Sequence, residues 1–207
     1  MQDYKKELII IGYSGHAYVM IDAALQVGYN FFGYTNLKEN IKNPYNLNYL
    51  GDENDINFKF FKKKYQFCVG IGDNKLRTKI SEKIRLKNKT LANIFHPDSS
   101  IFKNTIFGNG VFIAKNVAIN SFCEIHDDVI INTSATIDHE CLILSGAHIA
   151  PGSVLLGNVK IGKKSFVGSN SVIKEGVNIG DNVIIGAGSV VLNDILDNSI
   201  VYGNPAK

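Results

Sequence analysis

The second half of the chain carries a hydrophobic residue at every sixth position. From Ile101 to Val191, sixteen consecutive positions with this spacing are apolar, without an insertion. A second series, two residues earlier in each hexad, is small or β-branched from Val111 to Ser189. Period six with alternation inside it is not a helix pattern and fits short strands separated by turns. We therefore expect about five stacked coils of three parallel strands each, a β-solenoid with the long residues pointing inward.

The first 95 residues follow a different pattern, in which apolar runs end in glycine turns. Residues 7–11 read as a buried parallel strand, 17–27 as a helix and 31–34 as a second strand. Residues 66–72 predict another buried strand, and 75–86 a further helix. This order is the start of a βαβ arrangement, so we expect an α/β Rossmann-like domain with a parallel sheet.

The change of pattern gives two domains. We expect a Rossmann-like domain over residues 1–95 and a β-helix over residues 96–207, with His96-Pro97 at the passage between them. The first part holds 15 basic and 9 acidic residues, and the second holds 7 and 10. The basic part is better suited to an anionic ligand, although the Lys62-Lys63-Lys64 run also fits a solvated surface.

Two strand ends in the first domain are candidate ligand sites. Residues 12–16 form a glycine turn that leads into a helix, where free backbone N–H groups and the helix dipole favour an anion. The turn lacks the full dinucleotide fingerprint, and Thr35 and Asn36 stand where an acidic residue would end the second strand. A merely tight turn therefore stays an alternative. At the second strand end, Gly72 borders the crevice, and Arg77 faces either an anionic ligand or solvent.

One of the five histidines stands out by its setting. His139 lies between Asp138 and Glu140, two residues after an inward-pointing isoleucine, and His148 follows nine residues later. A carboxylate beside an imidazole favours the imidazolium and fixes the tautomer, which suits a general base. Cys141 falls on an inward-pointing small position and is expected to pack there instead of acting as a nucleophile.

Composition argues against several classes of protein. The net charge of +3 is too small to argue for nucleic acid, and no apolar run approaches a membrane span of about 20 residues. Lys5-Lys6 and the apolar run after them imitate a signal peptide, but no small-residue cleavage site follows. Three cysteines without CxxC spacing argue against a disulfide framework or a cysteine zinc site. We expect a protein of the reducing cytoplasm.

Taken together, these motifs resemble the PglD/NeuD-type sugar acetyltransferases, a group of hexapeptide-repeat left-handed β-helix acyltransferases. The likeness covers nearly the whole chain and is greatest to the N-acetyltransferases that act on a UDP-linked 4-amino-4,6-dideoxy sugar in bacillosamine biosynthesis. The motifs that carry it are residues 12–16, 70–74, 132–133, 138–141, 148–152, 157–162 and 203–207.

The resemblance implies a mechanism and a set of site residues. His139 would be the general base that takes a proton from the sugar amine, and Glu140 would raise its basicity. Acetyl transfer from acetyl-CoA would be direct, without an acyl-enzyme or a metal. The residues expected to contact acetyl-CoA are His148, Ser169 and Ala187. Those expected to hold the nucleotide-linked amino sugar are Ser14, Gly15, His16, Thr35, Asn36 and Gly72. The family also implies a homotrimer with active sites between subunits.

Other functions remain open from the sequence. GDP-perosamine N-acetylation or sialic-acid O-acetylation would keep the histidine base and change only the acceptor. A zinc lyase of the γ-carbonic-anhydrase type would need His126, His139 and His148 to converge, at spacings that do not share one face of an 18-residue coil. A non-enzymatic nucleotide-sugar-binding protein is a further alternative, and the His139-Glu140 pair in an otherwise apolar repeat argues against it.

Overall fold

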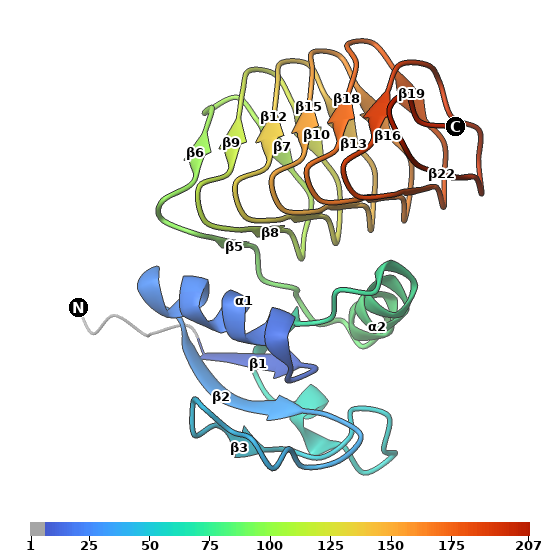
Figure 1. Ribbon diagram of the computed structural model, residues 1–207. Helices are drawn as coiled ribbons and strands as arrows, with labels where there is room; N and C mark the ends of the chain where they lie inside the picture. The colour runs from blue at the N-terminus through green and yellow to red at the C-terminus, as the bar shows by residue number, and fades with distance from the viewer. Residues whose placement is uncertain (1–6) are drawn as a thin grey trace.

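The computed structural model describes residues 7–207, so the leader-like Lys5-Lys6 pair lies outside the described residues. It divides into an α/β domain and a β-helix stacked on one side of it (Figure 1). None of the helices in residues 7–207 is long and apolar enough to cross a membrane.

The first domain is built on a parallel sheet in the order β3-β2-β1-β4. Its elements are β1 (Glu7–Ile11), α1 (Gly15–Gln26), β2 (Asn30–Thr35), β3 (Asn48–Tyr49), the 3-10 helix η1 (Lys59–Lys62), β4 (Gln66–Val69) and α2 (Asn74–Leu86). The apolar run of β1 is buried on both faces, as a central parallel strand requires. Leu8 and Ile10 join the core that includes α1, whereas Ile9 and Ile11 join the core that includes α2.

The predicted elements of this domain are present, with one shorter strand. The last strand ends at Val69 instead of reaching residue 72. Its next backbone N–H, on Gly70, still donates to Ile11, but Gly70 also lies against Ala17 so closely that a β-carbon would collide. The chain then leaves the sheet and enters α2, whose N-cap Asp73 accepts from the backbone N–H of Leu76 at 2.7 Å.

Residues from Ile94 onward form the parallel β-helix that the repeat predicts, with the left hand that the family resemblance implies. We number its sheets in chain order. Sheet 1 contains β5 (Ile94–Phe95), β8 (Phe112–Ile113), β11 (Ile130–Ile131), β14 (His148–Ile149), β17 (Phe166–Val167), β20 (Ile184–Ile185) and β22 (Ile200–Val201). Sheet 2 contains β6 (Ser100–Ile101), β9 (Ala118–Ile119), β12 (Thr136–Ile137), β15 (Val154–Leu155), β18 (Val172–Ile173) and β21 (Val190–Val191). Sheet 3 contains β7 (Ile106–Phe107), β10 (Glu124–Ile125), β13 (Leu142–Ile143), β16 (Lys160–Ile161) and β19 (Asn178–Ile179).

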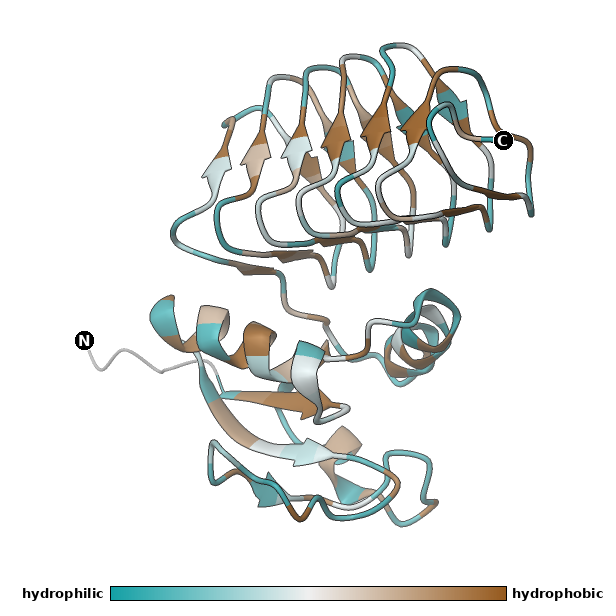
Figure 2. Cartoon of the chain, in the orientation of Figure 1, coloured by the Kyte–Doolittle hydropathy of each residue, from teal (hydrophilic) through white to brown (hydrophobic). Residues whose placement is uncertain are grey.

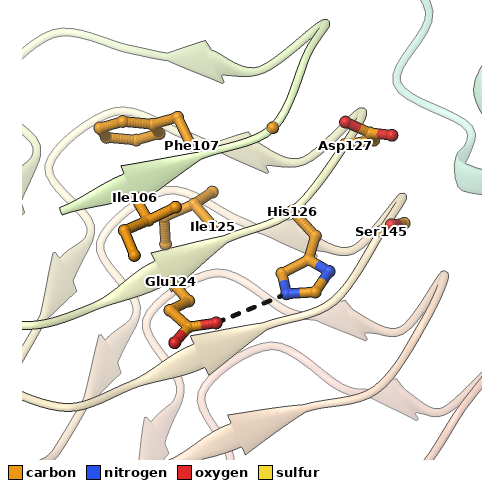
Figure 3. Close-up of a pocket in the computed structure, with 8 residues that line it drawn as sticks. Ile106, Phe107, Glu124, Ile125, His126, Asp127 and Ser145 are labelled. Carbon is orange, nitrogen blue, oxygen red and sulfur yellow. Dashed lines mark ion pairs between the residues drawn. The ribbon is translucent and has the colours of Figure 1, made fainter.

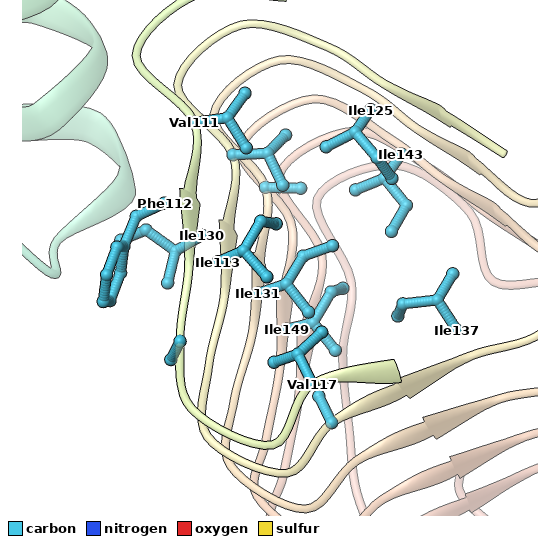
Figure 4. Close-up of a cluster of buried hydrophobic side chains, with 14 of the residues drawn as sticks. Val111, Phe112, Ile113, Val117, Ile125, Ile130, Ile131, Ile137, Ile143 and Ile149 are labelled. Carbon is cyan, nitrogen blue, oxygen red and sulfur yellow. The ribbon is translucent and has the colours of Figure 1, made fainter. Parts of the chain in front are cut away.

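Stacked rungs build the core of the β-helix. Residues 18 positions apart pair in register, so Ile131 lies against Ile149 and Ile125 against Ile143 (Figure 4). The first apolar series is buried from Ile113 onward, and its first two members, Ile101 and Phe107, are half-buried. Every member of the small series is buried. Figure 2 shows the corresponding colouring, with hydrophobic strands and more polar corners.

Sheet 1 faces the α/β domain, and a buried arginine joins the two. Figure 1 shows α1 between the parallel sheet and the strands β5 and β8. Arg77 on α2 is 2% exposed and donates from Nε to the Asp128 carbonyl at 2.9 Å and from Nη2 to the Gly146 carbonyl at 2.8 Å. Its Nη1 donates to the Gly72 carbonyl at 2.9 Å. The expectation that Arg77 faces a ligand or solvent is therefore wrong, because six hydrogen bonds to nearby oxygens hold it at the junction.

Candidate functional site

His139 lies on an exposed corner between sheets 2 and 3, in the turn that joins β12 to β13. Asp138 fixes this turn, because its Oδ1 accepts from the His139 backbone N–H and from Asn120 Nδ2, both at 2.9 Å. The same hydrogen bonds, that from Asn120 first, lower the pKa of Asp138 below its usual value. The turn closes with Glu140 in the left-handed region at a φ of 59°, where its N–H donates to the Ser121 carbonyl.

The side chains of this turn are arranged as a base and an orienting acid. His139 Nδ1 lies 3.1 Å from Glu140 Oε2, and the His139 side chain is 49% exposed. An Nδ1–H that donates to the carboxylate leaves the lone pair on Nε2, which lies 3.9 Å from Asp138 Oδ2 and is open to an incoming group. This geometry suits proton abstraction by Nε2.

A glycine on the next coil makes room for the imidazole. Gly157 occupies the position 18 residues after His139, and a β-carbon there would meet the Cε1 and Nε2 atoms of the ring. The backbone N–H of Asn158 also donates to the His139 carbonyl at 2.8 Å. The ring therefore rests on bare backbone, which sets its orientation.

Two thiols lie behind this corner. Cys123 and Cys141 are buried, and the Cys123 Sγ donates to the Asp138 carbonyl at 3.0 Å. The Cys141 Sγ donates to the Leu156 carbonyl at 3.2 Å. Hydrogen bonding to Cys123, and then burial, raise the pKa of Cys141, so it is held as a thiol. Both side chains are buried behind the turn and hydrogen-bond to backbone carbonyls.

The residues predicted to contact acetyl-CoA do not lie beside His139 in the same chain. Ser169 and Ala187 occupy equivalent positions, 18 residues apart, on the corner between sheets 1 and 2. They are half-buried and exposed, respectively. The Ser169 carbonyl accepts from the Gly188 N–H at 2.8 Å, which ties the two coils together. His139 is on the neighbouring corner, between sheets 2 and 3.

His148 meets His16 at the junction of the two domains. His148 on β14 is 7% exposed, and its Nε2 lies 3.2 Å from Asn132 Nδ2. Its ring centroid is 6.2 Å from that of His16 and 5.2 Å from that of Phe166. Within residues 7–207, His16 Nε2 and His148 Nδ1 are buried without a hydrogen-bond partner.

Burial makes both histidines poor bases. Desolvation, and then the charge of Arg77, lower the pKa of His16 to about 4. The same two causes, followed by His16 itself, lower the pKa of His148 to about 3. Both rings are therefore neutral near pH 7, and each keeps one unpartnered nitrogen that can bond to a ligand.

The predicted nucleotide residues fall into two groups. Ser14 and Gly15 are exposed at the start of α1, and Ser14 makes no side-chain cap, so its hydroxyl is free of the helix. Gly72 lies close by, on the loop after β4, and is half-buried. His16, the next residue of α1, lies beside His148 of sheet 1.

The second group sits at the end of β2 and contains an acid that the sequence did not reveal. Thr35 is fully buried, and its Oγ1 donates to Glu53 Oε2 at 2.8 Å. Asn36 is half-buried and donates from Nδ2 to Asn40 Oδ1 at 2.6 Å. Glu53 follows β3 in a loop, and no sequence spacing links it to β2. Its hydrogen bond with Thr35 nevertheless brings a carboxylate to the end of β2.

A third histidine lines a separate small pocket on sheet 3. The cavity of about 240 Å³ is bordered by Phe107, Glu124 and His126, whose Nε2 lies 3.9 Å from Glu124 Oε2 (Figure 3). His126, His139 and His148 thus occupy three different places on the β-helix. Among residues 7–207, no group of three histidine, cysteine or acidic side chains is placed to hold a metal ion.

Two family models match separate parts of the chain. The model of the PglD N-terminal domain matches residues 7–84, and the bacterial transferase hexapeptide model matches residues 140–175 and 158–193.

Solved structures match over almost the whole length. Perosamine N-acetyltransferase from Caulobacter crescentus, in complex with CoA and GDP-perosamine, is 32% identical with a TM-score of 0.92, covering 97% of this chain and 95% of that chain. The acetyltransferase domain of PglB from Neisseria gonorrhoeae, in complex with acetyl coenzyme A, is 28% identical with a TM-score of 0.90, covering 98% of both chains. WeeI from Acinetobacter baumannii, at 19% identity and a TM-score of 0.87, shares the fold over 98% of this chain and 99% of that chain.

Both domains, their order and the full-length match therefore agree on one family. The chain belongs to the PglD/NeuD-type sugar acetyltransferases, the acetyl-CoA-dependent sugar N-acetyltransferases built on a hexapeptide-repeat left-handed β-helix.

Proposed function

We propose that this enzyme acetylates the 4-amine of a nucleotide-linked 4-amino-4,6-dideoxy sugar, with His139 as the general base. The observation that carries the proposal is the His139–Glu140 pair, which presents an open Nε2 on an exposed corner. His139 is the histidine of the β-helix whose Nδ1 is held by a carboxylate at hydrogen-bond distance, 3.1 Å, while its ring stays half exposed.

The reaction needs one proton acceptor and no covalent enzyme intermediate. An ammonium cannot attack a carbonyl, so the sugar amine gives up a proton to His139 Nε2 as its nitrogen attacks the thioester carbon. The carbon–sulfur bond then breaks, and the CoA thiolate takes up the second proton that the acylated nitrogen loses, so that the products are a neutral amide and the CoA thiol. Glu140 stabilises the imidazolium during the transfer, because its carboxylate lies beside Nδ1.

The separation of the candidate residues supports an assembled site. His139 is on the corner between sheets 2 and 3, and Ser169 and Ala187 are on the corner between sheets 1 and 2. If the corner that carries His139 in one copy packed beside the corner that carries Ser169 and Ala187 in an adjacent copy, the base would lie next to acetyl-CoA. We infer a homotrimer with active sites between subunits, in which His148, Ser169 and Ala187 contact acetyl-CoA.

The N-terminal domain would hold the nucleotide. The start of α1 offers free backbone N–H groups at Ser14 and Gly15, and a diphosphate is a suitable ligand there. The buried Nε2 of His16 lacks a protein partner and can bond to the same ligand, with Gly72 at the other side of the crevice. Thr35 and Asn36 would border the nucleoside.

Two carriers are candidates for the amino sugar. The sequence likeness to bacillosamine enzymes favours UDP. The complexes of the Caulobacter enzyme, 32–33% identical to this chain, contain GDP-perosamine and favour GDP. Acetyl-CoA and nucleotide sugars are intracellular metabolites, and the three free thiols of the chain fit the reducing cytoplasm.

A thiol-release assay with acetyl-CoA tests the proposal. UDP-4-amino-4,6-dideoxy-GlcNAc, GDP-perosamine and a sialic acid are offered separately, and the product is identified by mass spectrometry. Turnover with either amino sugar supports the function, and turnover with the sialic acid alone makes the enzyme an O-acetyltransferase. His126→Ala is the matched control, because His126 is another exposed histidine beside a carboxylate and should keep full activity.

A further inference from the structure

A cavity of about 390 Å³ opens beside the carboxyl ends of β1 and β2, on the side of α2. Gly12, the first residue of the glycine turn, lines it, so the cavity borders the turn of the proposed diphosphate site. Aliphatic side chains form one part of its wall, and the polar or charged residues Asn36, Glu53, Asn54, Lys79, Glu82 and Lys83 form the other. A cavity next to a phosphate site that combines aliphatic walls with a few polar groups has the chemistry of a nucleobase pocket.

Glu53 provides a charged acceptor in this cavity. The residue is 6% exposed, and its carboxylate accepts from Thr35 Oγ1 at 2.8 Å and from Asn54 Nδ2 at 3.2 Å. Lys83 bonds to the Glu53 backbone carbonyl and to Asn54 Oδ1, both at 2.8 Å. In the described part of the chain, no lysine or arginine forms an ion pair with the Glu53 carboxylate.

Two protein donors leave this carboxylate with unused acceptor capacity. A carboxylate has about four lone-pair positions and no hydrogen to donate. A ligand that fills the cavity must therefore present N–H or O–H groups to Glu53. Because burying a carboxylate against an acceptor is costly, the residue discriminates between ligand edges.

We propose that Glu53 selects guanine over uracil, so that the acceptor is a GDP-linked amino sugar. Guanine presents two adjacent donors, N1–H and the 2-amino group, which match the two oxygens of a carboxylate. Uracil presents one N–H between two carbonyl oxygens, and one of these would face a carboxylate oxygen. The assignment rests on the proposed function for the sugar and its acetylation, and it adds the nucleotide carrier.

Calorimetric titration of the full-length protein tests the base contact directly. The ligands are GDP, IDP, 2′-deoxy-GDP and UDP. GDP should bind at least 10-fold more tightly than UDP, and IDP, which lacks the 2-amino group, should lose about 10-fold against GDP. Loss of the ribose 2′-hydroxyl should change little. Equal binding of GDP and UDP, no binding of GDP, or a loss with 2′-deoxy-GDP but not with IDP would each overturn the proposal.

The variant Glu53→Gln sharpens the test. The glutamine side chain has the size of glutamate, and its amide oxygen can still accept the hydrogen bond from Thr35. It offers the ligand one donor and one acceptor in place of two acceptors, which suits the edge of uracil. GDP affinity should fall about 10- to 100-fold, and the preference should move toward UDP. Glu175→Gln, which changes an exposed acid on the β-helix outside this cavity, should bind all four nucleotides as the wild type does. An unchanged ratio of GDP to UDP affinity in Glu53→Gln contradicts the assignment.

The two proposals fail in different ways. Selective GDP binding without acetyl transfer to any amino sugar would contradict the proposed function but support the proposed role of Glu53. Acetyl transfer to the UDP sugar and not to the GDP sugar would keep the function and sink the role of Glu53. If Glu53→Gln does not fold, the wild-type ratio of IDP to GDP affinity decides.

Discussion

The imidazole of His139 rests directly over the backbone of Gly157, one coil further along the β-helix. A β-carbon at position 157 would overlap the ring, on the side of Cε1 and Nε2. Gly157 is outside the left-handed region, so the backbone itself would accept an alanine. The glycine is therefore needed for the position of the base and not for the turn.

Gly157→Ala should lower kcat sharply while the protein stays folded. The added methyl group pushes the ring away from its position, and a displacement of about 1 Å can cost about 100-fold in rate. Steady-state kinetics and the melting temperature measure the two effects. Glu175→Ala, at the same corner position one coil further, should retain wild-type kinetics. A fully active Gly157→Ala enzyme would show that the observed ring position is not the catalytic one.

Glu140→Gln should lower kcat by roughly 10-fold, because a neutral amide stabilises the imidazolium less than a carboxylate does. The amide oxygen can still accept from Nδ1–H, so the ring keeps its orientation, and only the charge is lost. The KM values for both substrates should stay within about twofold, since Glu140 is not placed on either substrate. Equal losses in kcat and in acetyl-CoA affinity would instead indicate a binding role.

Arg77→Ala should destabilise the junction of the two domains by roughly 3–5 kcal/mol. The change removes the donors for the carbonyls of Asp128, Gly146 and Gly72 in a buried setting. Denaturant unfolding measures the loss, and Lys75→Ala, at an exposed position on the same helix, is the control. A denaturant curve that superimposes on the wild type would mean that the other contacts between the domains, such as the Arg85–Asp128 ion pair, hold them together without Arg77.

The buried histidines should make the enzyme less stable in mild acid. The pKa values of His16 and His148 are about 4 and about 3 in the folded chain, against 6.5 for an ordinary histidine. Below pH 6.5, His16 and His148 are therefore protonated in the unfolded chain while they stay neutral in the folded chain. The free energy of unfolding should fall from pH 6.5 toward pH 4, by up to about 1.4 kcal/mol per pH unit for each histidine.

Urea unfolding of the wild type and of His16→Gln between pH 4.5 and 7.5 measures this effect. The variant should lose less stability over that interval, because it lacks one of the two histidines that are protonated only in the unfolded chain. Above pH 7, His16 and His148 are neutral in both the folded and the unfolded chain, so they should add almost no pH dependence to the stability of either protein. Parallel curves for the two proteins would show that His16 is not held neutral by burial.

Periodicity predicted the β-helix well, because each long residue of the repeat has the same physical role. The inward position of Ile137, for example, follows from six-residue spacing alone, and it places His139 two residues later on a corner. The corner then predicts exposure, and the neighbouring Glu140 predicts an oriented base. These inferences need only local spacing.

Local spacing could not predict the contacts between segments that are far apart in the sequence. Arg77 lies at a helical position that looks open to ligand or solvent, and only the docking of sheet 1 against α2 buries it. The acid that reaches Thr35 comes from Glu53, 18 residues later in a loop without a pattern. His148 likewise sits on a strand position that would face solvent in an isolated β-helix, and the α/β domain covers it.

The most direct test of His139 as the base is a single-turnover measurement on the His139→Ala variant with saturating acetyl-CoA and amino sugar. The account predicts that the rate of acetyl transfer falls by about 10²- to 10⁴-fold, whereas the affinity for acetyl-CoA stays close to that of the wild type. An unchanged rate would remove His139 from the role of base and contradict the mechanism.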